Sequence, residues 1–84
     1  MNSKQKKILH DIFEKPTKLN ILWSDIEKCM LSLGATIRQS NGSAVVFVFQ
    51  NSILPFHKPH PQKEAQKYQI AHLRKFLQAK GVKL

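Results

Sequence analysis

Hydrophobic residues recur with the period of a helix over the first third of the chain. They form two groups: Ile8, Leu9, Ile12 and Phe13, and then Ile26, Cys29, Met30 and Leu33. The first group predicts a helix over 3–13, which Pro16 ends because proline disfavours the helical conformation of the residue before it. The second group predicts a helix that begins at Ser24 and closes near Gly34. For its start we expect a capping box, in which Ser24 accepts from an early backbone N–H and Glu27 reaches back to the Ser24 N–H.

Beyond Gly34 the hydrophobic period changes to the two-residue period of a strand. The expected strands are 36–38, 44–49 and 53–56. Asn41-Gly42 predicts the first hairpin turn, because both residues tolerate positive φ at the two central positions of such a turn. The middle strand is apolar on both faces, so it needs cover on both sides or a very apolar pocket on one.

The last segment predicts a third helix, over 64–80. Its inward-facing residues are Ile70, Leu73 and Leu77. Pro59 and Pro61 keep the preceding loop irregular. The order α-α-β-β-β-α predicts an α+β fold, in which helices pack on a three-stranded antiparallel sheet. With 84 residues and neither a repeat nor a linker, the chain is expected to form a single domain, 1–84.

The charge of the chain is strongly positive and unevenly placed. Fourteen Lys and Arg against five Asp and Glu give a net charge of +9. Seven of these cations, with one acid, lie in residues 58–84, whereas residues 20–57 are neutral overall. A local excess of this kind attracts phosphates or an acidic protein. A solvated lysine face that serves solubility alone is the other interpretation.

The composition disfavours several classes of protein. No apolar run approaches the roughly 20 residues of a membrane-spanning helix, and the Lys-rich start lacks the apolar stretch of a secretory signal peptide. The single cysteine, Cys29, excludes an internal disulfide and a multi-cysteine zinc site, and we interpret it as a small core residue. We therefore expect a cytoplasmic protein with no cofactor, metal or membrane partner.

Several short motifs, taken in their order along the chain, resemble the HicA toxin family. They are Ile21 to Glu27 with Leu33-Gly34-Ala35, Asn41-Gly42-Ser43, and Phe56 to Pro61 with Lys63-Glu64. The resemblance implies a double-stranded-RNA-binding-domain-like fold and an mRNA-cleaving toxin, which an acidic HicB-like antitoxin neutralises. It implies a core over 20–82 and an additional N-terminal helix, 3–14, as in one branch of the family. Two positions are open for this helix: the back of the sheet, or a dimer contact.

One residue departs from the family's typical Gly-Ser-His motif, which reads Gly42-Ser43-Ala44 here. The resemblance makes that histidine the catalytic residue, and alanine cannot transfer a proton. Three explanations stand: another histidine has taken over the role, cleavage has been lost, or the residue was changed to tame a toxin. The branch that this chain resembles often lacks the histidine, so an engineered change ranks last.

Metal-independent RNA cleavage needs a base for the 2′-hydroxyl, an acid for the leaving oxygen and cations for the phosphorane charge. His57 and His60 are the candidate catalytic residues, because histidine titrates near neutral pH and the two flank Lys58 in a proline-rich loop. A purely structural role is the main alternative. A metal site is less favoured, since it would need distant ligands such as Glu64 or His72.

Phosphate contact is expected at the Gly42-Ser43 turn, which exposes backbone N–H groups and a hydroxyl. The further candidate RNA-binding residues are Lys58, Lys63, Lys67, Arg74 and Lys75. We expect Lys67 and Arg74 to share one face of the last helix. Tyr68 is the one candidate for stacking on a base.

The sequence thus predicts an RNA-binding toxin that cleaves mRNA as a metal-independent endoribonuclease. A non-catalytic RNA-binding or interaction module on the same fold is the alternative, which Ala44 favours. A helix-turn-helix DNA-binding protein is disfavoured by the hairpin and strands over 36–57. The residues themselves do not separate RNA from DNA.

Overall fold

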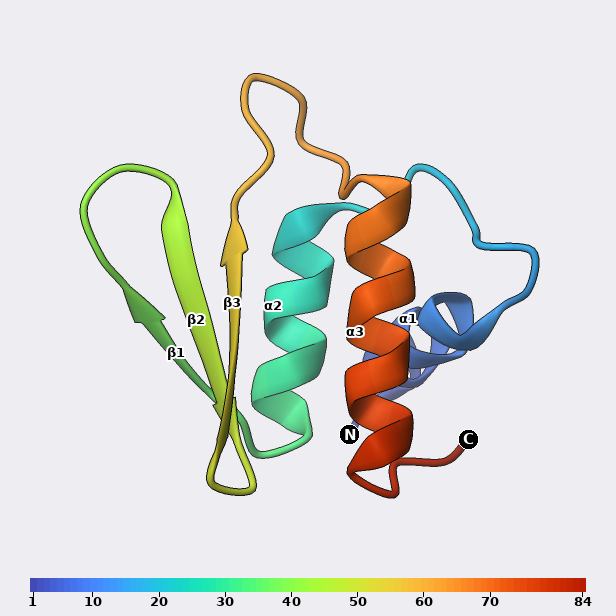
Figure 1. The fold of residues 1–84 in the computed structure, drawn as a ribbon. Coiled ribbons are helices and arrows are strands. Elements are labelled where there is room, and N and C mark those ends of the chain that lie inside the picture. Colours follow the sequence, from blue (N-terminus) through green and yellow to red (C-terminus); the bar gives the residue numbers. More distant parts are fainter.

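Three helices and one three-stranded antiparallel sheet make up the computed structural model, which describes residues 1–84 (Figure 1). In chain order the elements are α1 (Ser3–Phe13), α2 (Trp23–Ser32), β1 (Thr36–Gln39), β2 (Ala44–Phe49), β3 (Ser52–His57) and α3 (Lys67–Ala79). The expected α+β class and the order α-α-β-β-β-α are confirmed. No helix is both long and apolar enough to span a membrane.

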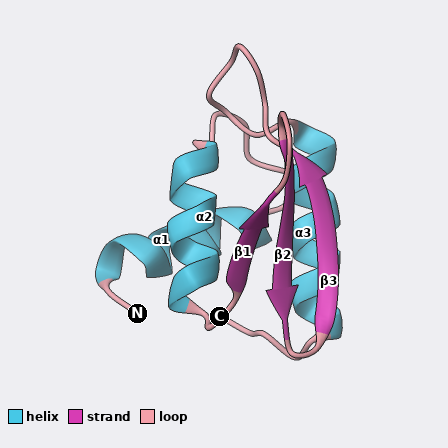
Figure 2. Ribbon diagram, turned by 90° about the vertical axis from the view of Figure 1, so that its left-hand side faces the viewer, coloured by secondary structure: helices cyan, strands magenta, loops and turns pink.

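The sheet has the strand order β1-β2-β3, and α2 and α3 cover one of its faces (Figure 1 and Figure 2). The buried side chains on that face are Val45, Phe47, Phe49, Leu54 and Phe56. On the opposite face Val46 and Val48 are half-buried, and Ile53 is 66% exposed. The apolar middle strand is therefore covered by helices on one side, and cover on both sides is not formed.

Three aromatic rings join the first turn of α2 to the sheet. The Trp23 ring stacks on Phe47 with 5.8 Å between centroids and meets Phe56 edge-on at 5.5 Å. Phe47 and Phe56 also contact each other, at 6.0 Å. Each such pair adds about 0.5–1.5 kcal/mol to the gain from burial alone. The start of α2 is thereby fixed against the centre of the sheet.

The predicted capping box at Ser24 and Glu27 is wrong. The helix begins one residue earlier, at Trp23, after the N-cap Leu22, which makes no side-chain capping bond. The physical reason lies in the pairing of the preceding chain: the Ala65 N–H donates to the Ile21 carbonyl, and the Trp23 N–H donates to a carbonyl of the loop before α3. This extended pairing holds the chain up to Leu22 and leaves Glu27 free for other partners.

The same pairing delays the start of α3. The helix was expected from residue 64, but Glu64 forms an isolated antiparallel bridge with Leu22, so the chain is extended there. The helix begins at Lys67 instead, where the Gln66 N–H donates to Gln69 Oε1 at 2.8 Å.

The Asn41-Gly42 turn differs from the expected geometry. In the β1–β2 loop Gly42 has a positive φ of 72°, whereas Asn41 does not. The turn with positive φ at both central residues is the β2–β3 turn, at Gln50 (50°) and Asn51 (63°). The β1–β2 loop has four residues, of which Gly42 alone is left-handed. The Ser40 N–H donates to the Ala44 carbonyl and closes the loop.

Helix α1 packs against α2 and α3 on the side away from the sheet (Figure 1 and Figure 2). Of the two positions left open for this helix, the back of the sheet is therefore excluded. Arg74 of α3, 6% exposed, connects the helices. Its guanidinium donates to the Ile12 carbonyl at 3.4 Å, the Glu14 carbonyl at 2.6 Å and Thr17 Oγ1 at 2.8 Å. It therefore satisfies carbonyls that the end of α1 leaves without helical partners.

We expect Arg74→Ala to lower the free energy of unfolding by about 2–4 kcal/mol, because two carbonyls lose a charged donor in a buried place. Urea denaturation monitored by circular dichroism measures this loss. Lys75→Ala, an exposed neighbour on the same helix, is the control and should change stability by less than about 0.5 kcal/mol. Equal stability of the two variants would contradict this role of Arg74.

Cys29 lies fully buried in the core, as expected. Burial raises the pKa of its thiol to about 11. Because only the thiolate is nucleophilic, the folded protein should react with a disulfide reagent at pH 8 at least about 100-fold more slowly than the urea-unfolded chain. The neutral thiol also contributes stability that is present below the unfolded pKa of about 8.5 and is lost as the pH rises towards 11. Equal reaction rates in the folded and unfolded states would refute this prediction.

Candidate functional site

The β1–β2 loop, the end of β3 and the starts of α2 and α3 lie at the same end of the molecule (Figure 1). An open hollow of about 500 Å³ occurs there, lined by Gly42, Ser43, Lys58, Pro59 and His60. Four of these five residues were candidates from the sequence. The structure therefore brings the Gly-Ser turn and the histidine-containing loop together, although they are separated by the whole of β2 and β3.

His57 stands beside this hollow and contacts Ser43. Its Nδ1 lies 3.2 Å from Ser43 Oγ, and the side chain is exposed. The loop that follows is tied to the same serine, because the Lys58 N–H donates to the Ser43 carbonyl at 2.8 Å. The hydroxyl of Ser43 thus contacts the imidazole of His57, and the carbonyl of Ser43 holds the main chain at Lys58, just after β3.

The register of the sheet places His57 opposite Ala44. The two residues are direct partners in the antiparallel pairing of β2 with β3. Directly paired residues project from the same face of a sheet, with their Cβ atoms about 4.5–5.5 Å apart. The imidazole of His57 therefore extends from the strand next to the position that alanine occupies in the Gly42-Ser43-Ala44 turn.

Lys58 has an acidic neighbour that the sequence did not indicate. Its ammonium lies 3.5 Å from Glu27 Oε2, and the same oxygen accepts from the Trp23 indole N–H at 3.1 Å. Glu27 was interpreted as part of a cap, and only the packing of α2 against the loop reveals its other partners. The pair directs the half-buried Lys58 towards the start of α2, while the lysine still lines the hollow.

A second hollow, of about 530 Å³, adjoins the first. It lies between the start of α2 and the proline-rich loop, and Pro59 and His60 line both hollows. Lys63 lines the second hollow, opposite Leu22 and Ser24. His60 therefore stands between a polar hollow at the Gly-Ser turn and a second one beside Lys63.

The remaining candidate cations lie elsewhere. Lys67 and Lys75 are exposed on α3 but line neither hollow, and Lys75 is eight residues, or about 12 Å, further along the helix. Arg74 is buried against the end of α1, so it does not share an exposed face with Lys67 as expected. Tyr68, the candidate for base stacking, is 63% exposed in the first turn of α3.

Part of the charge at the N-terminus is balanced within the fold. Asp11 lies 3.3 Å from both Lys7 and Lys18, and Asp25 lies 3.6 Å from Lys4. No comparable set of ion pairs covers Lys63, Lys67 or Lys75. Among the candidate RNA-binding residues, Lys63, Lys67 and Lys75 therefore carry charge that no ion pair balances.

Metal chemistry has no ligand set in this structure. No group of three or more His, Cys, Asp or Glu side chains lies close enough to hold a metal ion. His72, which could have been a distant ligand, is exposed on α3 and its ring meets the edge of Phe56 at 5.6 Å.

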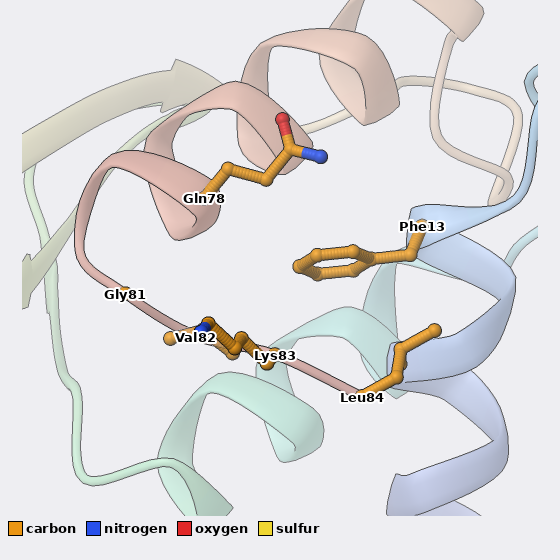
Figure 3. A pocket seen from close by; sticks show the side chains of 6 residues that line it. All are labelled: Phe13, Gln78, Gly81, Val82, Lys83 and Leu84. Carbon is orange, nitrogen blue, oxygen red and sulfur yellow. The ribbon is translucent and has the colours of Figure 1, made fainter.

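A further hollow, of about 480 Å³, lies where the C-terminal segment passes between α1 and α3 (Figure 3). Its lining consists of Phe13, Gln78, Gly81, Val82, Lys83 and Leu84. Lys83 is its one titratable side chain, so it offers no pair of groups for acid–base chemistry. The histidine-containing hollow is the stronger candidate site.

Residues 23–81 match the family described as HicA toxin of bacterial toxin-antitoxin. Comparisons with curated proteins and with solved structures gave no match. The matched range begins with α2 and ends just after α3, so it contains both hollows, while α1 lies outside it. Because it covers more than two thirds of the 84 residues, this chain belongs to the HicA toxin family of bacterial toxin–antitoxin systems.

Proposed function

We propose that this protein is a toxin that binds mRNA in the cytoplasm and cleaves it without a metal ion, with His57 as the general base. The observation that carries the proposal is the pairing of His57 with Ala44. The family's motif has histidine where this chain has Ala44, and His57 supplies an imidazole from the facing strand. A histidine lost from β2 is thereby replaced across the sheet.

The contacts of His57 suit a general base. When its Nδ1–H donates to Ser43 Oγ, the other ring nitrogen, Nε2, keeps a free lone pair that faces away from this bond. Nε2 can then take the proton of an RNA 2′-hydroxyl as the 2′-oxygen attacks the adjacent phosphorus. The hydroxyl of Ser43 fixes the orientation of the ring.

His60 and Lys58 complete the chemistry. His60 donates a proton to the 5′-oxygen as its bond to phosphorus breaks, so the products are a 2′,3′-cyclic phosphate and a 5′-hydroxyl. The Lys58 ammonium stabilises the negative charge that develops on the phosphorane. Lys58 and His60 line one hollow, and His57 contacts Ser43, which also lines it. The backbone N–H groups at Gly42 and Ser43 are suited to the phosphate.

The rest of the proposed RNA surface follows the uncompensated cations. Lys63 in the second hollow, followed by Lys67 and Lys75 on α3, would contact phosphates along one strand. Arg74 is left out because its guanidinium is occupied by α1. RNA is favoured over DNA because the proposed chemistry needs a 2′-hydroxyl.

Membership of a toxin–antitoxin family supports a protein partner. We propose that an acidic HicB-like antitoxin covers the hollow and the lysines of α3, so that antitoxin and RNA compete. Opposite charges would speed the association of the two proteins.

One observation favours a second function, a non-catalytic RNA-binding module. Ala44 leaves the family's own histidine position without a titratable group. His57 would then contribute only its hydrogen bond to Ser43. The two functions differ in whether bound RNA is cut.

The proposed replacement of the family's histidine by His57 is tested by returning an imidazole to position 44. We expect His57→Ala to lower the rate of RNA cleavage in EDTA by about 100- to 10,000-fold, the usual contribution of a general base. The double variant Ala44→His/His57→Ala should regain part of this loss, because the imidazole again reaches the hollow from the facing strand. Cleavage of a long RNA is followed on denaturing gels.

His10→Ala, on α1 and remote from the hollow, is the control and should cleave like the wild type. If the wild type binds RNA but leaves it intact, the non-catalytic module is the correct function. If His57→Ala cleaves at the wild-type rate, the base is a different residue.

The RNA surface is testable by comparing two charge-matched double variants. Lys58→Ala/Lys63→Ala should weaken single-stranded RNA binding and lower the slope of log affinity against log salt by about 1.4, because two phosphate contacts are lost. Lys6→Ala/Lys15→Ala removes the same charge from the N-terminal region and should leave the slope within about 0.3 of the wild type. Fluorescence anisotropy at four salt concentrations measures both. Equal slopes for the two variants would place the RNA elsewhere.

A further inference from the structure

Gln69 is a primary amide buried in an otherwise apolar part of α3. Its side chain is 2% exposed. Both of its polar groups are satisfied: Oε1 accepts from the Gln66 N–H at 2.8 Å, and Nε2 donates to the His57 carbonyl at 2.8 Å. Burying an amide costs free energy unless it is fully hydrogen-bonded, so these two bonds have to form together.

The bond to His57 completes a clamp on a single peptide unit. The carbonyl of that unit belongs to His57 and accepts from Gln69, and its N–H belongs to Lys58 and donates to the Ser43 carbonyl at 2.8 Å. The peptide between His57 and Lys58 is therefore held from both ends, by α3 on one side and by the β1–β2 loop on the other. His57 is the last residue of β3, and Lys58 begins the irregular segment that follows.

The chain beyond this peptide has little other support of its own. Pro59 and Pro61 follow, and proline has no N–H with which to continue the pairing of the strand. Without the bond from Gln69, the peptide would keep only its contact with the exposed β1–β2 loop. Rotation of the peptide would then move the side chains on both of its sides, His57 and Lys58, relative to Ser43.

We propose that Gln69 is a positioning residue, which holds the His57–Lys58 peptide so that the imidazole stays at Ser43 beside the hollow while Lys58 lines it. The proposal rests on the proposed function, in which these two side chains act on one phosphate. Gln69 itself is buried beneath the loop and does not touch RNA. It also fixes the first turn of α3 through Gln66, so the lysine-bearing helix and the histidine keep a constant separation.

The test replaces Gln69 by Met, which has a similar length and shape but neither hydrogen-bonding group. Displacing a reacting group by about 1 Å can cost on the order of 100-fold in rate. We expect Gln69→Met to lower kcat for RNA cleavage by about 10- to 100-fold while KM changes by less than about 3-fold, since the phosphate-binding lysines remain. Ile70→Val, a neighbouring buried substitution that removes no hydrogen-bonding group, is the control for a general loss of stability and should keep both constants near the wild type.

A second measurement, hydrogen exchange of the Lys58 amide, tests the clamp in the absence of RNA. In the wild type the Lys58 amide is hydrogen-bonded, so we expect slow hydrogen exchange by nuclear magnetic resonance. In Gln69→Met this amide should exchange at least about 10-fold faster, while amides of β2 keep their protection. Should Gln69→Met fail to fold, Gln69→Asn retains a buried amide that is one methylene too short for both bonds, and it should show the same two effects.

The outcomes separate this inference from the function on which it rests. Unchanged exchange of the Lys58 amide in the Gln69 variants, or a fall in kcat no larger than in Ile70→Val, would overturn the positioning role. A wild type that does not cleave RNA would overturn the proposed function instead. The exchange of Lys58 alone then decides whether Gln69 holds this peptide, with faster exchange supporting the clamp and unchanged exchange refuting it.

Discussion

The antiparallel register of β2 and β3 sets both the core and the candidate site. In one and the same ladder Phe47 pairs with Leu54 on the buried face, and Ala44 pairs with His57 beside the hollow. A slip of one residue would turn every side chain of a strand to the opposite face. It would expose the phenylalanines of β2 and take the histidine away from Ser43. The two-residue turn at Gln50 and Asn51 fixes this register, since both residues have positive φ, as two-residue hairpin turns require.

Trp23 connects the core residues of the sheet with the charged groups at the surface. Its ring packs on Phe47 and Phe56, and its indole N–H bonds Glu27, which in turn pairs with Lys58 at the hollow. A residue buried for hydrophobic reasons therefore also places a charged group of the site. On the other side of the hollow, Gln69 does the same for the main chain of His57. Buried residues from α2 and α3 thus hold a loop that has almost no regular structure of its own.

Helix α1 adds stability, and its contacts occupy cations that would otherwise be free to bind a polyanion. It lies outside the range that matches the family, and it is held by Arg74 of α3 and by the ion pair of its Lys4 with Asp25 of α2. Arg74 of α3 consequently has a structural role. The surface proposed for a polyanion is the group of lysines on the loop before α3 and along this helix. The net charge of +9 therefore overstates the positive charge that is available to bind RNA.

The sequence by itself determined the elements, because their signals are local: two hydrophobic periods, Pro16 after α1 and the apolar run of β2. It also indicated the Gly42-Ser43 turn and the His57–His60 loop as candidates for the functional site. Only the tertiary structure decided which cations are free, since the partners of Arg74 lie 57 to 62 residues away along the chain. The same holds for the pairing of His57 with Ala44, and for Glu27 and Gln69, which sequence patterns left as a presumed cap and an unremarked polar residue. A local pattern records how a segment folds, whereas a site depends on contacts between segments, and those are fixed when the sheet and helices pack.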